Sequence, residues 1–208
     1  KRQIYEIPKG FLKKIYQEIR SFGGVVIADE VQSGFGRLGD QMWAYQDDAV
    51  VPDIVTMGKP MGNGHPVSAL LTHRELIESL DQAYNGNSYF NTFGGNPVSA
   101  AAALSVLDII EEDSLIDQAG QVGNYLKKQL RNTLQNKESV VEIRGKGLFL
   151  GIELDDPSKT AKTMEEMMRQ GVLVGKTGPT NSVIKLRPSM TFKKEHADLL
   201  VEKLNQCL

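Results

Sequence analysis

Two charged residues near the start of the chain each follow a short apolar run. Asp29 comes directly after residues 25–28, and Lys59 follows residues 54–57 at a distance of two positions. Each run predicts a buried strand, so both charges are expected at the carboxyl edge of a sheet, where open α/β sheets bind ligands. An acid beside an amine suits pyridoxal phosphate, because the amine forms a Schiff base with the aldehyde and the acid pairs with the pyridinium nitrogen. The alternative is a pair of solvated surface charges.

Composition and charge define the general class of protein. The chain has 208 residues, of which 40% are hydrophobic and 24% charged, enough for one large globular domain or two small ones. A net charge of −2 gives no reason to expect nucleic acid or a membrane as partner. One cysteine, Cys207, permits no intrachain disulfide and favours a reducing compartment. With no membrane-spanning stretch and no signal peptide in residues 1–10, we predict a cytoplasmic protein.

The first predicted element is an amphipathic helix over residues 8–20, which leads through Gly23 and Gly24 into the first strand. A crossover connection of this kind requires an earlier strand, and residues 1–7 offer little apolar sequence for one. We therefore expect that the sheet lacks some of its members and that the chain is a fragment.

Three glycines after Asp29 match the spacing of a dinucleotide-binding fingerprint: Gly34, Gly36 and Gly39. That fingerprint places its first glycine at the strand end and opens a helix at once. Here residues 30–33 intervene and no helical period follows, while Asp53, the acid at a suitable distance, precedes its apolar run. We interpret the glycines as a loop around a ligand instead.

The segment after Lys59 predicts a hairpin-like return. Residues 62–66 form a turn, residues 67–72 a strand, and residues 74–80 a helix for which Thr72 is the candidate cap. His65 is interpreted as a turn residue, with a catalytic role as the alternative. No two histidines have metal-ligand spacing, so no metal site is expected.

Residues 84–96 predict a long loop, and residues 98–112 predict a helix with Pro97 in its first turn. Thr92 and the amides of Gly94 and Gly95 lie just before this helix, where an anion such as phosphate can bind. An ordinary capped helix start is the alternative.

The remainder predicts a small α/β unit. Its expected helices cover residues 114–135, 160–170 and 195–208, and its expected strands cover residues 140–144, 148–154, 172–174 and 183–186. Gly145, Lys146 and Gly147 are expected to turn between the first two strands. Met164, Met167 and Met168 are interpreted as core filling.

Four segments together resemble the class III pyridoxal phosphate aminotransferases: residues 27–37, 57–59, 92–97 and 144–149. The resemblance extends over essentially the whole chain and implies an α/β protein. It implies part of the large domain of the type I pyridoxal-phosphate transferase fold in residues 1–112, and a small C-terminal α/β domain in residues 113–208.

The resemblance also implies residue roles. Lys59 becomes the catalytic Schiff-base lysine, and Asp29 the catalytic partner of the pyridinium nitrogen. Val31 would pack beneath the cofactor ring and Gln32 would hydrogen-bond the ring hydroxyl. Thr92 would bind the cofactor phosphate of a neighbouring subunit, which implies a homodimer.

The sequence departs from the family pattern where the substrate is expected to bind. Lys185 stands where many members have an arginine, Arg187 is shifted by two positions, and Ser189 replaces a proline. Strand alternation puts Lys185 and Arg187 on one face, so either can meet a substrate anion, although lysine lacks the bidentate fork of arginine. This tail is similar to the branch that contains alanine-glyoxylate aminotransferase 2-like proteins and phospho-lyases.

Three hypotheses for the function follow. The first is a transaminase that moves an amino group between an amine or amino acid and an oxo acid. The second is a phospho-lyase acting on phosphoethanolamine or phosphohydroxylysine, and the third is a non-catalytic dimerisation or binding module. Because the family takes further cofactor contacts from an N-terminal half, the isolated chain is expected to bind pyridoxal phosphate weakly and to be inactive.

Overall fold

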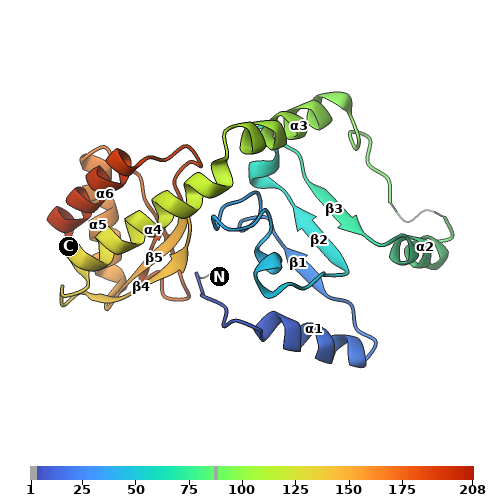
Figure 1. The fold of residues 1–208 in the computed structure, drawn as a ribbon, viewed down its shortest axis with the longest axis horizontal. Coiled ribbons are helices and arrows are strands. Elements are labelled where there is room, and N and C mark those ends of the chain that lie inside the picture. The colour runs from blue at the N-terminus through green and yellow to red at the C-terminus, as the bar shows by residue number, and fades with distance from the viewer. Residues whose placement is uncertain (1–3, 87–88) are drawn as a thin grey trace. The chain divides into compact units, whose positions relative to one another are not determined.

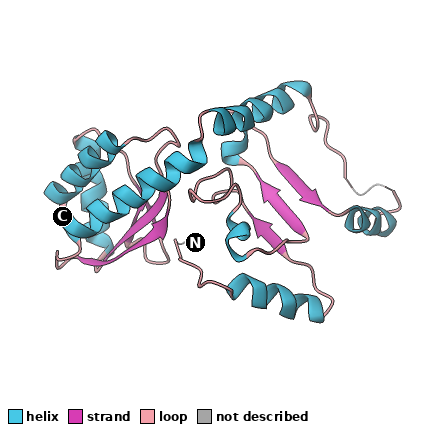
Figure 2. Cartoon of the chain, viewed as in Figure 1, coloured by secondary structure: helices cyan, strands magenta, loops and turns pink. Residues whose placement is uncertain are grey.

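The computed structural model describes residues 4–86 and 89–208, and these form two compact units (Figures 1 and 2). The N-terminal unit contains Pro8–Phe35 and Gln41–Asp113. The C-terminal unit contains Ser114–Leu208 together with residues 4–7 and Gly36–Asp40. These two short segments were assigned to the other part of the chain by the sequence, and the predicted domain division stays a prediction.

The N-terminal unit is built on a three-stranded sheet of β1 (Ile27–Asp29), β2 (Ile54–Met57) and β3 (Ala69–Thr72), in that order. β1 and β2 run parallel, with Asp29 opposite Thr56. β3 returns antiparallel to β2, as the hairpin-like connection predicted. The sheet therefore presents the ends of β1 and β2 at one edge (Figure 1).

Side chains cap two of the helices of this unit, one from a distant segment and one from the residue directly before the helix. The helices are α1 (Phe11–Ser21), η1 (Ala44–Asp48), η2 (Lys59–Gly62), α2 (Arg74–Ala83) and α3 (Pro97–Glu112). The carboxylate of Asp48 accepts from the amides of Gly10 and Leu12 at 2.7 and 2.8 Å, so it caps α1. Asn96 caps α3 by accepting from the Ser99 amide at 2.9 Å.

The predicted cap of α2 was wrong. The residue before that helix is His73, whose side chain makes no capping bond. The hydroxyl of Thr72 donates instead to the carbonyl of Asp53 at 2.8 Å, because Thr72 is the last residue of β3 and pairs with Ile54 of β2.

Asp53 joins α1 to the start of β1. Its carboxylate accepts from the Val26 amide at 2.8 Å and from the Arg20 guanidinium at 2.8 Å. The Val26 amide and the Arg20 charge lower the pKa of Asp53, because both favour the ionised carboxylate. This acid therefore has a structural role, which fits the rejection of a dinucleotide site.

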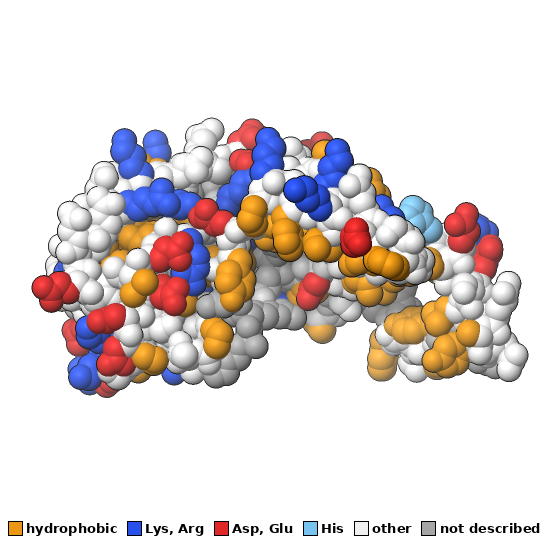
Figure 3. Space-filling model, turned by 90° about the horizontal axis from the view of Figure 1, so that it is seen from below, with side chains coloured by type: hydrophobic (Ala, Val, Ile, Leu, Met, Phe, Trp, Pro, Cys, Tyr) orange, Lys and Arg blue, Asp and Glu red, His pale blue; other side chains and the backbone are white. Residues whose placement is uncertain are grey.

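The prediction that the first strand is buried was wrong for one of its faces. Ala28 is buried, whereas Ile27 is 59% exposed and Val25, before the strand, is 47% exposed. Leu70 and Leu71 of β3 and Phe11, Ile15 and Ile19 of α1 are exposed as well. Figure 3 shows hydrophobic side chains lying open on the face of the molecule that it views. Apolar runs indicate burial only where a second layer covers them, and the described residues of this unit do not cover this surface.

The C-terminal unit has an antiparallel sheet in the order β4-β5-β7-β6, formed by Val140–Lys146, Phe149–Leu154, Val183–Leu186 and Gly175–Thr177 respectively. Three helices pack on the sheet and on one another: α4 (Leu115–Leu134), α5 (Pro157–Arg169) and α6 (Lys194–Cys207). The core between them includes Leu126, Leu130, Ile152, Met167, Ile184 and Leu204. Met167 fills the core as predicted, whereas Met168 is 57% exposed.

Two strand boundaries differ from the prediction. The strand expected at residues 172–174 lies at Gly175–Thr177 instead. The amide of Val172 donates to the carbonyl of Met167 at 2.8 Å and so closes the end of α5, which removes it from strand pairing. The turn between β4 and β5 was expected at residues 145–147 but consists of Gly147 and Leu148, because Lys146 still pairs with Phe149.

Two of the glycines interpreted as a loop around a ligand, Gly36 and Gly39, pack against α4, and their ligand role stays a prediction. A Cβ on Gly39 would lie 2.3 Å from the Cα of Gly120 in α4, so only glycine permits this approach. The carbonyl of Arg37 accepts from the Leu148 amide at 3.1 Å, and Asp40 pairs with Lys146 at 2.7 Å. Gly36–Asp40 is thereby fixed to α4 and to the β4–β5 turn.

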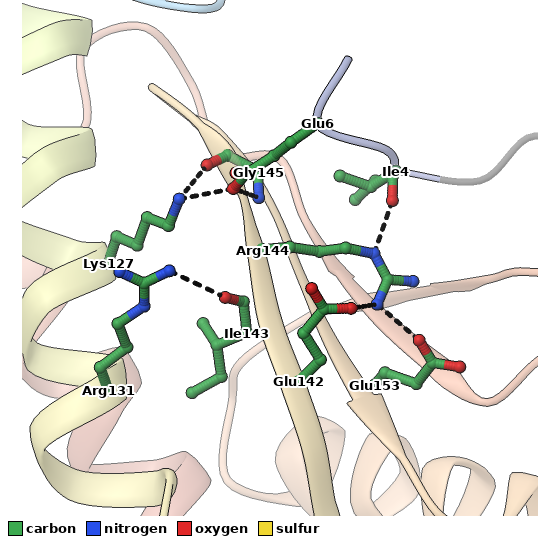
Figure 4. A network of polar contacts seen from close by, with 9 residues as sticks. All are labelled: Ile4, Glu6, Lys127, Arg131, Glu142, Ile143, Arg144, Gly145 and Glu153. Atoms are coloured by element: carbon green, nitrogen blue, oxygen red, sulfur yellow. Dashed lines mark hydrogen bonds and ion pairs between the residues drawn. The ribbon is translucent and has the colours of Figure 1, made fainter. Parts of the chain in front are cut away.

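A polar network ties the start of the described chain to β4 and β5 (Figure 4). Arg144 is 6% exposed, and its guanidinium donates to the carbonyl of Ile4 at 2.7 Å and to the carboxylates of Glu142 and Glu153. Glu6 accepts from the Gly145 amide at 2.7 Å and from Lys127 at 2.6 Å. Arg144, the first residue of the segment 144–149 that resembles the aminotransferases, thus has a structural role.

Arg144→Met tests how much this network contributes to the free energy of unfolding. The substitution removes one buried charge and leaves two carboxylates and a carbonyl without their donor, so we expect a loss of about 1–3 kcal/mol in the free energy of unfolding. Chemical denaturation of the full-length protein, followed by circular dichroism, measures it. The matched control is Arg169→Met, which removes an exposed pair with Glu165 and is expected to cost less than about 0.5 kcal/mol. Equal losses would contradict the assignment.

Candidate active site

Asp29 is the last residue of β1, and its carboxylate is positioned by the backbone that follows. The amide of Val31 donates to Asp29 Oδ1 at 3.2 Å, and the hydroxyl of Thr56 on β2 lies 3.5 Å from the same oxygen. The amide of Glu30 continues the parallel pairing by donating to the Thr56 carbonyl at 3.0 Å. The residue is exposed, and its carboxylate lies at the carboxyl edge of the sheet.

Glu30 supports this edge, and the sequence reasoning missed it. It is 2% exposed, and its two oxygens accept from the Ser33 hydroxyl at 2.7 Å and from the Tyr45 amide at 3.0 Å. These bonds hold the turn that contains Val31 and Gln32. The one sequence signal was an acid next to a buried strand, which is rare unless the acid has partners.

Lys59 follows β2 in a backbone conformation that lysine rarely adopts. Its φ angle is 44°, in the left-handed region, and it opens the short helix η2. A non-glycine residue held there costs on the order of 1 kcal/mol, and such positions concentrate at functional sites. The strain is maintained because β2 before Lys59 and the rest of η2 after it fix the chain.

Val31 lies close to the backbone that precedes Lys59. A Cβ placed on Gly58 would be 3.9 Å from Val31 Cγ1, an ordinary contact distance. Val31 and Gln32 come directly after Asp29 and Glu30, so the edge combines an acid, an amine, an apolar side chain and an amide. This set fits pyridoxal phosphate, which offers a ring nitrogen, an aldehyde, a flat apolar ring and a hydroxyl.

The remaining predicted cofactor residue, Thr92, lies elsewhere in this unit. It is exposed in the turn before α3, where the Asn91 side chain accepts from the Phe93 amide at 3.0 Å. His65, the other residue considered for catalysis, bonds the Ser99 hydroxyl at 2.8 Å and so connects the segment after η2 to α3.

The two predicted substrate residues belong to the C-terminal unit. Lys185, in β7, and Arg187, just beyond it, both line a cavity of about 480 Å³. The rest of the lining is largely apolar and comes from residues 171–175, Leu186, Pro188, Phe192, His196, Leu199 and Leu200. A Cβ on Gly175 would lie 3.3 Å from Lys185 Cε, so the lysine stem runs across this glycine. The cavity is therefore lined by two cationic side chains on one part and by mainly apolar residues on the rest.

The side chains were also compared with what a metal site requires. In residues 4–86 and 89–208, no group of three or more His, Cys, Asp or Glu side chains is placed to hold a metal ion. Within the same ranges, no helix has both the length and the apolar character needed to cross a membrane.

Comparison with known proteins supports the resemblance. The model of the family described as aminotransferase class-III matches residues 4–208. A Drosophila melanogaster protein named alanine–glyoxylate aminotransferase 2-like is 44% identical over 97% of this chain and 42% of its own length. A Caenorhabditis elegans protein named ethanolamine-phosphate phospho-lyase homolog 1 is 39% identical over 97% of this chain and 45% of its own.

Two solved structures of similar enzymes agree with the match to this family. A phospholyase from Arthrobacter in complex with phosphoethanolamine matches with a TM-score of 0.90 and 44% identity, over 97% of this chain and 49% of that one. A Bacillus anthracis aminotransferase matches with a TM-score of 0.90 and 32% identity, over 96% and 48% of the two chains. The chain thus spans less than half the length of these proteins.

These matches confirm the predicted α/β fold class and pyridoxal phosphate as the cofactor. The roles predicted for individual residues stay predictions. From the match over residues 4–208 and from relatives well above 30% identity across nearly the whole sequence, we conclude that this chain belongs to the class-III aminotransferase family.

Proposed function

We propose that this chain forms part of a pyridoxal-phosphate enzyme that eliminates phosphate from a phosphorylated amine such as phosphoethanolamine. The observation that carries the proposal is the pair of cations, Lys185 and Arg187, on one cavity. A carboxylate brings one negative charge, whereas a phosphate monoester brings between about −1.5 and −2 at neutral pH. Two cations from one strand end match the larger charge, with arginine as a fork and lysine as a point charge.

The similarity to the Arthrobacter phospholyase in complex with phosphoethanolamine supports this substrate class. The apolar part of the cavity gives the short carbon chain of such a substrate a surface to lie on. No oxo acid is needed for elimination, which distinguishes the proposal from transamination.

Each residue at the sheet edge has a defined task in this proposal. Bound pyridoxal phosphate supplies an electron-withdrawing ring that stabilises the charge left when the substrate loses a proton. Asp29 keeps a proton on the ring nitrogen, Val31 packs against the ring, and Gln32 donates to the ring hydroxyl. Lys59 Nζ would take the proton from the carbon that carries the amine, and the bond from the neighbouring carbon to the phosphate oxygen would then break, with phosphate leaving with the bond electrons. One water would convert the remaining unsaturated two-carbon amine to an aldehyde and ammonia.

Transamination is the second candidate. It is favoured by relatives named alanine–glyoxylate aminotransferase 2, and it would use the same four residues. The difference is the fate of the proton on Lys59 Nζ: with no phosphate to leave, Lys59 would pass it to the former aldehyde carbon of the cofactor, which would then keep the amino group for transfer to an oxo acid. Retention of both Asp29 and Lys59 argues against the third hypothesis, a non-catalytic module.

We further propose that the active form is a homodimer in which Thr92 contacts the cofactor phosphate held by a second copy. Thr92 lies in a segment whose aromatic side chains are open: Tyr89 is 78%, Phe90 88% and Phe93 80% exposed. Exposed apolar groups of this size are typical of interfaces, and a two-fold interface would bury both copies of the segment. The predicted cytoplasmic location stays a prediction, since two relatives are named as mitochondrial.

The first experiment separates the two reactions. Incubation of the full-length holoenzyme with O-phosphoethanolamine, without any oxo acid, is expected to release phosphate and ammonia in equal amounts. Colorimetric phosphate and enzymatic ammonia assays measure the two products, and Lys59→Ala is the control. Turnover that depends strictly on an added oxo acid would favour transamination and contradict the proposal.

The second experiment tests the site of action of Thr92. Copies with Lys59→Ala are refolded together with copies with Thr92→Val. If Thr92 acts across the interface, each mixed dimer regains one complete site, so random pairing is expected to restore about a quarter of the wild-type activity per subunit. Activity no higher than the mean of the two separate variants would show that Thr92 acts within its own subunit or not at all.

A further inference from the structure

Arg37 contacts the wall of the cavity that Lys185 and Arg187 line. Its guanidinium Nη1 donates to the carbonyl of Pro188, which lines the cavity directly after Arg187. The hydrogen bond connects two parts of the C-terminal unit that are 151 positions apart in sequence. Arg37 therefore holds the chain at the point where it leaves β7.

The backbone of Arg37 is itself held firmly. Its carbonyl accepts from the Leu148 amide at 3.1 Å. On either side, Cβ atoms on Gly36 and Gly39 would lie 2.5 Å from Ile116 Cγ1 and 2.3 Å from Gly120 Cα, both in α4. Because the backbone at Arg37 is held in this way, we infer that the Arg37 side chain fixes the position of Pro188.

The charge of Arg37 also acts on the cavity. Burial, and next the like charge of Arg187, lower the pKa of Arg37 to about 10, so the guanidinium is still protonated at neutral pH. Two positive charges that disfavour each other are stabilised together when an anion binds between or beside them. The guanidinium also offsets the negative end of the Pro188 carbonyl dipole at the cavity wall.

We propose that Arg37 is a positioning residue for the anionic group of the substrate: it fixes the Pro188 end of β7, which presents Lys185 and Arg187, and adds its charge to theirs. The inference rests on the proposed function, in which Lys185 and Arg187 bind the substrate phosphate. Arg37 acts through Pro188 and Arg187 and is not required to touch the substrate.

The test compares three variants of the full-length holoenzyme. Arg37→Gln removes the charge but keeps a donor, and Arg37→Lys keeps the charge but lacks the guanidinium fork. Asp40→Asn is the matched control, because it breaks the pair with Lys146 on the same segment without touching Pro188. The readouts are KM and kcat for O-phosphoethanolamine and the calorimetric Kd for inorganic phosphate.

For Arg37→Gln, loss of a charge-assisted interaction is expected to raise both KM and the phosphate Kd roughly tenfold, with kcat within about twofold. For Arg37→Lys, an increase of about threefold in both constants is expected, because the charge remains. Asp40→Asn is expected to change neither by more than about twofold. Should the glutamine variant fail to fold, the lysine variant decides alone.

Any of the following results would overturn the inference. The first is a fall in kcat with unchanged KM and Kd in the Arg37 variants, and the second is an equal effect of Asp40→Asn. The third is no effect of Arg37→Lys when Arg37→Gln cannot be obtained. Lys185→Gln with Arg187→Gln separates the levels of the argument: if this pair leaves the phosphate Kd unchanged, the proposed function fails and the role of Arg37 fails with it. If the pair raises Kd and Arg37→Gln does not, only the role of Arg37 is wrong.

Discussion

The parallel pairing of β1 with β2 determines where the chemistry of this chain can take place. Because Asp29 lies opposite Thr56, the carboxylate and Lys59, three residues further along, leave the sheet at the same edge. The carboxyl ends of two parallel strands lie at the same edge of the sheet, so the direction of pairing brings the acid and the amine close together. A shift of the register by one residue would turn either side chain to the opposite face of the sheet.

The groups around this edge hold it in place. Buried Glu30 binds Ser33 and the Tyr45 amide, which fixes the turn that follows Asp29. On the other strand, the left-handed conformation of Lys59 is fixed between β2 and η2. Strain of this kind persists only where the surroundings impose it, which is the expected arrangement for a side chain that must present its amine at a defined position. In the C-terminal unit, Arg37 and Pro188 form a comparable support for Lys185 and Arg187.

The sequence predicted most elements of the fold, because their signals are local. The apolar period of α4, the proline at the start of α3 and the glycine that ends α5 each name an element boundary through short-range chemistry. The strand at residues 172–174 was misplaced because hydrophobicity does not show whether an amide is already used to close a helix, as that of Val172 is. The exposure of Ile27 was misjudged because an apolar residue is buried only where a second layer covers it, and the described residues of this unit leave Ile27 uncovered.

For the candidate site, residue types predicted the chemistry but not its supports. Asp29 and Lys59 were identified by their position after apolar runs, whereas Glu30 and Arg37 depend on partners 15 and 151 residues away, which no local pattern contains. Likewise, the spacing of the glycines after Asp29 could not reveal that α4 packs against Gly36 and Gly39.

The central claim is that Lys59 is the residue that holds pyridoxal phosphate. Borohydride reduction of the full-length holoenzyme fixes the cofactor covalently to the amine that carries it, and peptide mapping by mass spectrometry then identifies that amine. We predict that the label is found on the peptide containing Lys59. A label on any other lysine, or no label in a protein that has bound the cofactor, would contradict the account.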